Sequence, residues 1–211
     1  CKLDGTEYEN VTVSDTAPNE PENEQYWIDI SSSPHVLKQY STVNSMWASV
    51  ATTYIKISAT GLGEPFAEGD GVTISDITVD ELEDLNSTMI VWGRGDNYII
   101  VTGILAAVKS QETPITVKRQ MPEMDFVIES NNRLWGCRYG LNADGDVVNE
   151  IYASKLGDFK NWNCFAGIST DSYAASLGTD GQFTGAITHL GYPLFFKENC
   201  LHRVYGYYPA Q

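Results

Sequence analysis

Residues 124–137 have the sequence MDFVIESNNRLWGC, and residues 193–206 have the sequence PLFFKENCLHRVYG. Each stretch contains an apolar run, a polar turn and a second run, which is the pattern of a β-hairpin. Arg-Leu-Trp-Gly follows the first turn and Arg-Val-Tyr-Gly follows the second, so the second stretch resembles a repeat of the first. A recurring β-unit is typical of repeated all-β architectures. Residues 121–211 are therefore predicted to form two propeller-like blades, each a four-stranded antiparallel unit.

The character of the sequence changes between residues 47 and 120. Ala48 to Ile57 alternates apolar and polar residues, and FAEGDGVTIS at 66–75 combines a glycine turn with the start of a strand. Further strands are predicted at 88–92, 98–102 and 115–118. Short strands separated by glycine-containing turns are typical of a compact β-domain. We predict a small β-barrel-like module at 47–120, inserted between propeller-like segments.

The first 46 residues are predicted to form a linker followed by propeller-like strands. Residues 1–24 are polar and acidic and include Pro18 and Pro21, which is typical of a turn-rich connector. Residues 25–30 alternate polar and apolar side chains, as a half-buried strand does. The chain begins at Cys1 rather than Met, and we expect it to be a fragment of a longer protein.

The composition argues against two classes of partner. A net charge of −15 with no basic stripe disfavours nucleic acid, whose phosphates would be repelled. No apolar run is long enough to suggest a transmembrane segment. The four cysteines (Cys1, Cys137, Cys164 and Cys200) contain no C-x-x-C pair and no histidine at metal-ligand spacing. Cys137, Cys164 and Cys200 lie in apolar runs, and the cysteines are predicted to be buried free thiols. Disulfides are the alternative, and no cofactor is predicted.

Asn142, Asp144 and Asp146 have the alternate spacing of a calcium-binding loop. The glycine that such a loop requires is replaced by Val147, and the bidentate glutamate by Ala153. The pattern therefore predicts an Asp-Gly hairpin between two strands. A calcium site remains the alternative interpretation.

Residues 154–162 (SKLGDFKNW) loosely resemble the Asp-box hairpin of sialidase-like propellers, although Leu156 stands where that box has its aspartate. Gly157 and Asp158 would make the turn, and Trp162 would pack against the neighbouring blade, which is structural work. A sialidase also needs an arginine cluster and a tyrosine–glutamate pair, and no such pattern recurs. There is no Gly-x-Ser-x-Gly motif either. The chain is therefore predicted not to be an enzyme.

Four stretches carry a resemblance to a known family, and they are listed here: MDFVIE at 124–129, NRLWGC at 132–137, NEIYASKLGD at 149–158 and LFFKENCLHRVYG at 194–206. They resemble virion proteins of tailed bacteriophages and of prophages of gut bacteria, which are described as structural or tail proteins. The resemblance covers residues 26–211. It implies a propeller-like protein of the tail or tail tip, assembled in the bacterial cytoplasm, with other virion proteins and further copies of itself as partners. It supplies no catalytic residues.

Carbohydrate or receptor binding is the alternative function, and a sialidase-like glycoside hydrolase is the second alternative. Aromatic side chains that stack on sugar rings are a common recognition device, and a host surface glycan is the ligand that they suggest. The alternative role of these rings is to fill the space between blades. The candidate residues are Trp162, Tyr173, Tyr192, Tyr205, Tyr207 and Tyr208.

Overall fold

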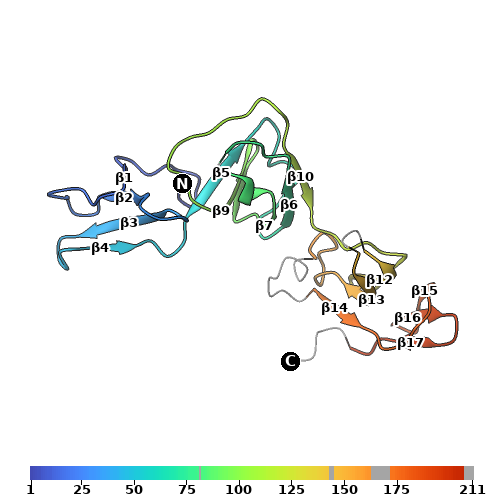
Figure 1. Ribbon diagram of the computed structural model, residues 1–211. Coiled ribbons are helices and arrows are strands. Elements are labelled where there is room, and N and C mark those ends of the chain that lie inside the picture. The colour runs from blue at the N-terminus through green and yellow to red at the C-terminus, as the bar shows by residue number, and fades with distance from the viewer. Residues whose placement is uncertain (81, 143–144, 163–171, 207–211) are drawn as a thin grey trace. The chain divides into compact units, whose positions relative to one another are not determined.

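The structure, a computed structural model, describes residues 1–80, 82–142, 145–162 and 172–206. Within these ranges it contains strands, turns and the 3-10 turn η1 (Glu83–Leu85), so the predicted all-β class is confirmed (Figure 1). The strands form five small open sheets, and the described part of the chain contains neither a closed barrel nor a closed propeller. None of its helical segments is long and apolar enough to cross a membrane. The chain divides into two compact units, Cys1–Val117 and Lys118–Gln211, which are described separately.

The first unit begins with a four-stranded sheet in the order β1-β2-β3-β4. Its strands are β1 (Thr12–Ser14), β2 (Tyr26–Asp29), β3 (Val36–Ser41) and β4 (Met46–Ser49). β1 pairs parallel with β2, and the other pairs are antiparallel. The next strand, β5 (Tyr54–Ser58), belongs to a different sheet. The single strand predicted from Ala48 to Ile57 is therefore wrong, and β4 spans the predicted domain limit at residue 47.

The rest of the first unit is built from two three-stranded sheets, in the orders β5-β9-β8 and β10-β6-β7. These strands are β6 (Gly71–Ser75), β7 (Thr88–Ile90), β8 (Gly93–Gly95), β9 (Tyr98–Thr102) and β10 (Thr116–Arg119). Their apolar side chains share one core, in which Val72, Val91 and Ile99 are fully buried. Asp70 closes the turn before β6 by accepting a 2.8 Å hydrogen bond from the Ala67 amide. The predicted barrel-like module therefore takes the form of two open sheets around a core.

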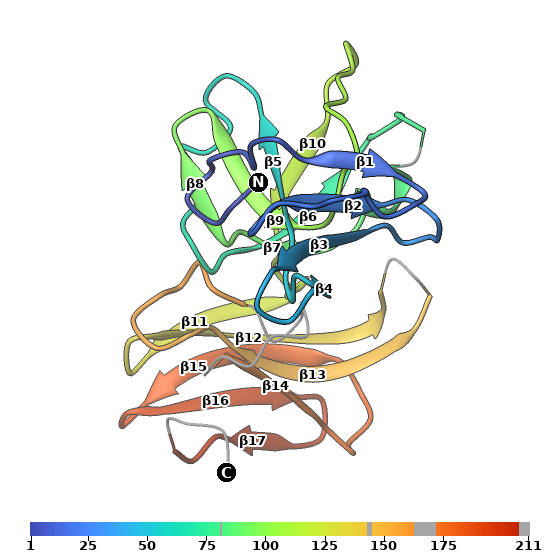
Figure 2. The same ribbon diagram turned by 90° about the vertical axis from the view of Figure 1, so that its left-hand side faces the viewer.

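The second unit contains the predicted four-stranded antiparallel sheet, in the order β11-β12-β13-β14. Its strands are β11 (Phe126–Ser130), β12 (Arg133–Leu141), β13 (Val147–Ala153) and β14 (Tyr173–Ser176). A three-stranded antiparallel sheet follows, with β15 (Phe183–His189), β16 (Tyr192–Lys197) and β17 (Leu201–Arg203). The two sheets stack, as Figure 2 shows, and share a core that includes Trp135, Cys137, Ile151, Phe183 and Phe195.

Both hairpins predicted from the repeat form, but they are not equivalent. β11 and β12 are the first two strands of their sheet, whereas β16 and β17 are the last two of theirs. Arg133 is the first residue of β12 and is buried, while Arg203 is the last residue of β17 and is exposed. The predicted equivalence of Arg-Leu-Trp-Gly and Arg-Val-Tyr-Gly is therefore wrong.

The hairpin that matches β11–β12 is β15–β16. Each has a two-residue turn whose central residues both have positive φ: Asn131 (54°) and Asn132 (59°), and Leu190 (49°) and Gly191 (78°). This is the backbone requirement of a type I′ turn. The two tips also touch, because the Asn131 side-chain amide donates a 2.7 Å hydrogen bond to the Gly191 carbonyl. A shared turn geometry thus identifies the structural repeat better than the Arg-x-aromatic-Gly string does.

The turn at Leu190 predicts a stabilising substitution. A leucine in the left-handed region is strained by about 1–2 kcal/mol, and asparagine tolerates this region better. Leu190 is also 82% exposed, so its loss removes little packing. We expect Leu190→Asn to raise the free energy of unfolding of the second unit by about 1 kcal/mol in urea titrations. Leu190→Ala keeps the backbone strain and should not stabilise the second unit. Equal gains in unfolding free energy from both variants would contradict the assignment of backbone strain to Leu190.

The close packing around Gly63 predicts a destabilising substitution. A Cβ at this position would lie 1.8 Å from the Gly95 carbonyl oxygen and 2.6 Å from that of Tyr98, and both are backbone atoms. Because the backbone cannot move aside easily, Gly63→Ala should lower the stability of the first unit by about 3 kcal/mol. Gly178→Ala is the matched control, since its Cβ would meet open space. Denaturant unfolding that gives the same loss for both variants would refute the packing argument.

Candidate binding surface

Two of the predicted aromatic residues, Tyr192 and Tyr205, come together around an arginine. Their ring centroids are 5.5 Å apart with the planes tilted by 56°. The guanidinium carbon of Arg203 lies 3.9 Å from the centroid of the Tyr192 ring and 4.6 Å from that of Tyr205. Tyr205 is 71% exposed, and Arg203 is also exposed. We call Tyr192, Arg203 and Tyr205 the tyrosine–arginine cluster.

Strand pairing explains why the cluster faces solvent. Along a strand, alternate side chains point to opposite faces of the sheet. Phe195 of β16 points into the core. Residues an odd number of positions from Phe195 therefore point to the opposite, outer face; these are Tyr192, Leu194 and Phe196. Leu194 pairs with Arg203, which places Arg203 on that same face. This outer face of the β15–β17 sheet is where the cluster forms.

The remainder of the outer face is apolar. Ile187 is 52% exposed and Leu201 is 51% exposed, and the ring of Phe196 is exposed between β15 and β17. Phe196 pairs with Leu201, and Ile187 pairs with Leu194. We call Ile187, Phe196 and Leu201 the apolar patch. The patch and the cluster adjoin on one sheet face, because Ile187 and Arg203 flank Leu194 in the same row of paired residues.

Two further aromatic candidates, Trp162 and Tyr173, do not join this surface. Trp162 is fully buried, and its indole N–H donates a 2.9 Å hydrogen bond to the Phe159 carbonyl. Tyr173 packs edge-to-face against Trp135, with ring centroids 5.7 Å apart. Both therefore fill space within the second unit. Tyr207 and Tyr208 lie outside the described residues.

Arg203 is the residue that the sequence did not single out. It was predicted only as part of the repeated Arg-x-aromatic-Gly string, beside the buried Arg133. The signal that could have found it is its spacing from Tyr205, because residues two apart on an extended segment share a side. In the part of the chain that the structure describes, the Arg203 guanidinium has ring contacts but no hydrogen bond or ion pair.

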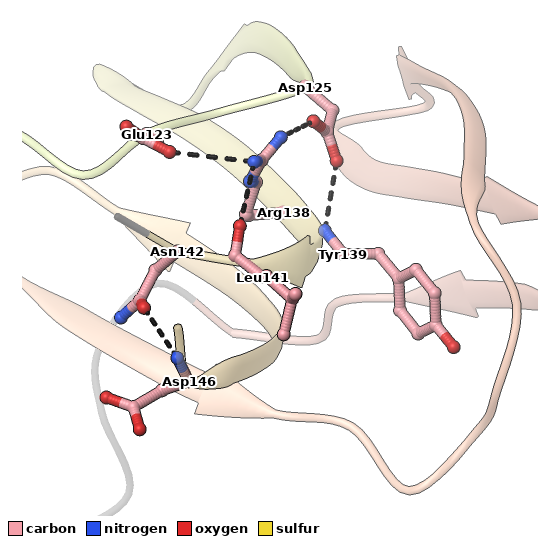
Figure 3. A network of polar contacts seen from close by, with 7 residues as sticks. All are labelled: Glu123, Asp125, Arg138, Tyr139, Leu141, Asn142 and Asp146. Atoms are coloured by element: carbon pink, nitrogen blue, oxygen red, sulfur yellow. Dashed lines mark hydrogen bonds and ion pairs between the residues drawn. The ribbon is translucent and has the colours of Figure 1, made fainter. Parts of the chain in front are cut away.

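The proposed calcium loop forms the hairpin between β12 and β13 (Figure 3). The Asn142 side-chain oxygen accepts a 2.8 Å hydrogen bond from the Asp146 amide, and the Asn142 amide donates to the Asp146 carbonyl at 3.0 Å. The predicted hairpin is thus confirmed. Asp144 lies outside the described residues, among which no group of three or more His, Cys, Asp or Glu side chains could hold a metal ion. Calcium binding stays a hypothesis.

Figure 3 also shows how the segment that precedes β11 is held against β12. The Arg138 guanidinium binds Asp125 at 2.6 Å and lies 3.6 Å from Glu123, and it also donates to the Leu141 carbonyl at 3.2 Å. The hydrogen bond to Asp125 raises the pKa of Arg138. The second Asp125 oxygen accepts from the Tyr139 amide at 2.9 Å. The network therefore ties the segment before β11 to β12.

A second polar cluster lies on the inner side of the β15–β17 sheet. The Lys197 ammonium is buried and donates hydrogen bonds to Asn149 Oδ1 and to the Thr179 carbonyl, both at 2.6 Å. His202 Nε2 is 2.7 Å from Thr179 Oγ1 and 3.5 Å from Cys200 Sγ. Burial lowers the pKa of His202, and the Lys197 charge adds to this effect. His202 is therefore a hydrogen-bonded histidine of this sheet.

Three arginines of the second unit have different partners. Arg133 donates to the Ser154 carbonyl in the interior, and Arg138 pairs with Asp125. Arg203 stacks on tyrosine rings. A shallow groove of about 520 Å³ does border Arg133, with the exposed ring of Phe159 at its rim.

Comparisons with known proteins add no assignment. No protein-family model matches the chain, and no curated protein or solved structure matches it significantly.

The cysteines allow a direct test of the core. Cys1, Cys137 and Cys200 are free, and desolvation raises the pKa of the buried Cys137 thiol to about 12. Because only a thiolate reacts, iodoacetamide at pH 8 should modify the partly buried Cys1 and Cys200 but leave Cys137 intact in the folded protein. Peptide mass mapping should show Cys137 modified after unfolding in urea. Equal labelling of Cys137 and Cys200 in the folded state would contradict this packing.

Proposed function

We propose that this chain is a structural component of a phage virion, in the tail or tail tip, and that it works through protein–protein assembly without catalysing a reaction. The proposal takes up the resemblance to virion proteins of tailed phages that the sequence analysis describes. The observation that supports it is the apolar sheet face that the second unit presents to solvent. The apolar patch is the single observation that carries the argument.

The patch is suited to a protein partner because its exposure to water is energetically unfavourable. A cluster of large apolar side chains on a sheet face leaves that surface in contact with water, and such patches mark interaction sites. The adjacent tyrosines and arginine are residue types that dominate binding energy at protein interfaces. The preferred partners are other virion proteins and further copies of this chain.

The stacked sheets suggest how assembly would be organised. The inner face of the β15–β17 sheet packs on the β11–β14 sheet through Phe183, Phe195 and Trp135. Neighbouring blades of a propeller stack in this way, and we propose that both sheets act as blades. A further sheet, placed against the apolar patch, would bury it as the inner face is already buried. The net charge of −15 and the absence of a basic stripe favour protein over nucleic acid as the partner.

Carbohydrate binding is the second candidate function, and the tyrosine–arginine cluster favours it. Tyr192 and Tyr205 are the two predicted aromatic candidates that meet at the surface. A receptor-binding module of a phage tail would use such a cluster to hold a host surface glycan. Assembly and glycan binding would then use adjoining parts of the same sheet face.

The assembly proposal predicts that a charge in the apolar patch blocks incorporation. Leu201→Glu would have to bury a carboxylate in the interface, and the loss of about 2 kcal/mol or more expected at an interface centre corresponds to more than tenfold weaker association. Particles made with this variant should carry at least tenfold less of the protein, measured by immunogold electron microscopy and quantitative blotting of purified virions.

Val147→Glu is the matched control, because Val147 is exposed at the start of β13 and lies outside the patch. It should be incorporated like the unmodified protein, and circular dichroism should show both variants folded. A labelled antibody that finds the unmodified protein on no phage particle would refute the proposal. Normal incorporation of Leu201→Glu would show that the patch is not the assembly surface.

A further inference from the structure

We infer that the tyrosine–arginine cluster is a binding site for an acidic saccharide, a sugar that carries a carboxylate or a phosphate. This inference rests on the second candidate function, carbohydrate binding, and specifies the ligand class for it. The acidic group would be held by Arg203, and the sugar ring would lie against Tyr205.

The first argument is the state of Arg203. Its guanidinium offers five N–H donors in a planar fork that matches the oxygens of a carboxylate or phosphate. Within the described residues it has no hydrogen-bond or ion-pair partner. Arg138, in the same unit, by contrast contacts Asp125, Glu123 and the Leu141 carbonyl. Arg203 therefore retains its full capacity to bind an anion.

The second argument is preorganisation. Arg203 is stacked at 3.9 Å on Tyr192 and lies 4.6 Å from the Tyr205 centroid, so two rings restrict its motion. Neither ring contact is a hydrogen bond, so the N–H donors of the guanidinium remain available to a ligand. A side chain that is ordered before binding loses less conformational freedom when the ligand arrives. The two tyrosines thus prepare Arg203 to receive an oxyanion.

The third argument favours a saccharide over a protein carboxylate. Polar groups that suit a polyhydroxylated ligand gather at this end of the face: two phenol hydroxyls, the Arg203 guanidinium and the exposed His189, which pairs with Tyr192. Arg203 lies in the row of Ile187 and Leu194, between the row of His189 and Tyr192 and the row of Phe196 and Leu201. The polar groups therefore lie on the side of Arg203 that faces away from Leu201. Tyr205, at 71% exposure, leaves ring surface accessible for a sugar.

The negative charge of the whole chain excludes a nonspecific attraction as the reason for binding an anion. At −15 the protein repels anions at long range. A preference for acidic over neutral sugars therefore cannot come from general attraction, and it must come from a cation in contact with the ligand. Arg203 is the cation that the cluster supplies.

The experiment is isothermal titration with three probes: glucuronic acid for the carboxylate, glucose 6-phosphate for the phosphate, and glucose as the neutral sugar. We expect at least one acidic sugar to bind tenfold or more tightly than glucose, and the stronger of the two identifies the acidic group. Arg203→Gln should abolish that preference. Arg203→Lys, which keeps the charge but loses the fork, should retain only part of it.

Arg94→Gln is the matched control, because Arg94 is an exposed arginine of the other unit, and it should bind like the unmodified protein. Circular dichroism should show that every variant is folded. Binding of glucose as tight as that of both acids would overturn the acidic-ligand inference but leave carbohydrate binding standing. A different outcome would be that none of the three sugars binds and that Arg203→Gln weakens self-association in sedimentation velocity. The acidic-ligand inference and the carbohydrate-binding function would then both be overturned, and the cluster would belong to a protein interface.

Discussion

The second unit depends on one contact, the burial of aromatic side chains between two stacked sheets. Trp135 and Phe195 are fully buried where the β11–β14 and β15–β17 sheets meet. Burial of a large aromatic side chain removes about 150–250 Å² from water, so a few such residues dominate the stability of a small unit. The hairpin tips add a polar contact at the edge of this core through Asn131 and Gly191. Stacking of sheets, rather than closure of one sheet, organises this part of the chain.

The same contact decides which side chains are available for function. Because side chains alternate along a strand, fixing Phe195 inward sends Phe196 outward. The register of β17 against β16 then places Arg203 beside Leu194 and Leu201 beside Phe196 on the outer face. The apolar patch and the tyrosine–arginine cluster are therefore consequences of how the core is packed. Among the described residues Arg203 on this face contacts tyrosine rings, whereas Arg138 contacts Asp125 and Glu123.

The sequence predicted the elements better than their relationships. The all-β class, the four-stranded antiparallel sheet and the hairpin at Asn142 are visible in alternation and turn residues, which act over a few positions. The matching hairpin at Leu190 was missed because leucine is an unusual residue in the left-handed region, and the signal there is carried by Gly191 alone. The break between β4 and β5 was missed because both strands have the same alternation, and only their partners differ.

The candidate site shows the same limit. Tyr192 and Tyr205 were among the predicted ligand-binding residues, as were Trp162 and Tyr173, because composition cannot separate a ring that fills a core from one that faces solvent. The distinction depends on register: Tyr173 pairs with Ala153 and so lies over Trp135, while Tyr192 pairs with the exposed His189. Arg133 and Arg203 follow the same rule, one directed into the interior and the other away from it. The chemistry of this protein is therefore set by pairing across the sheet, which a string of residues does not display.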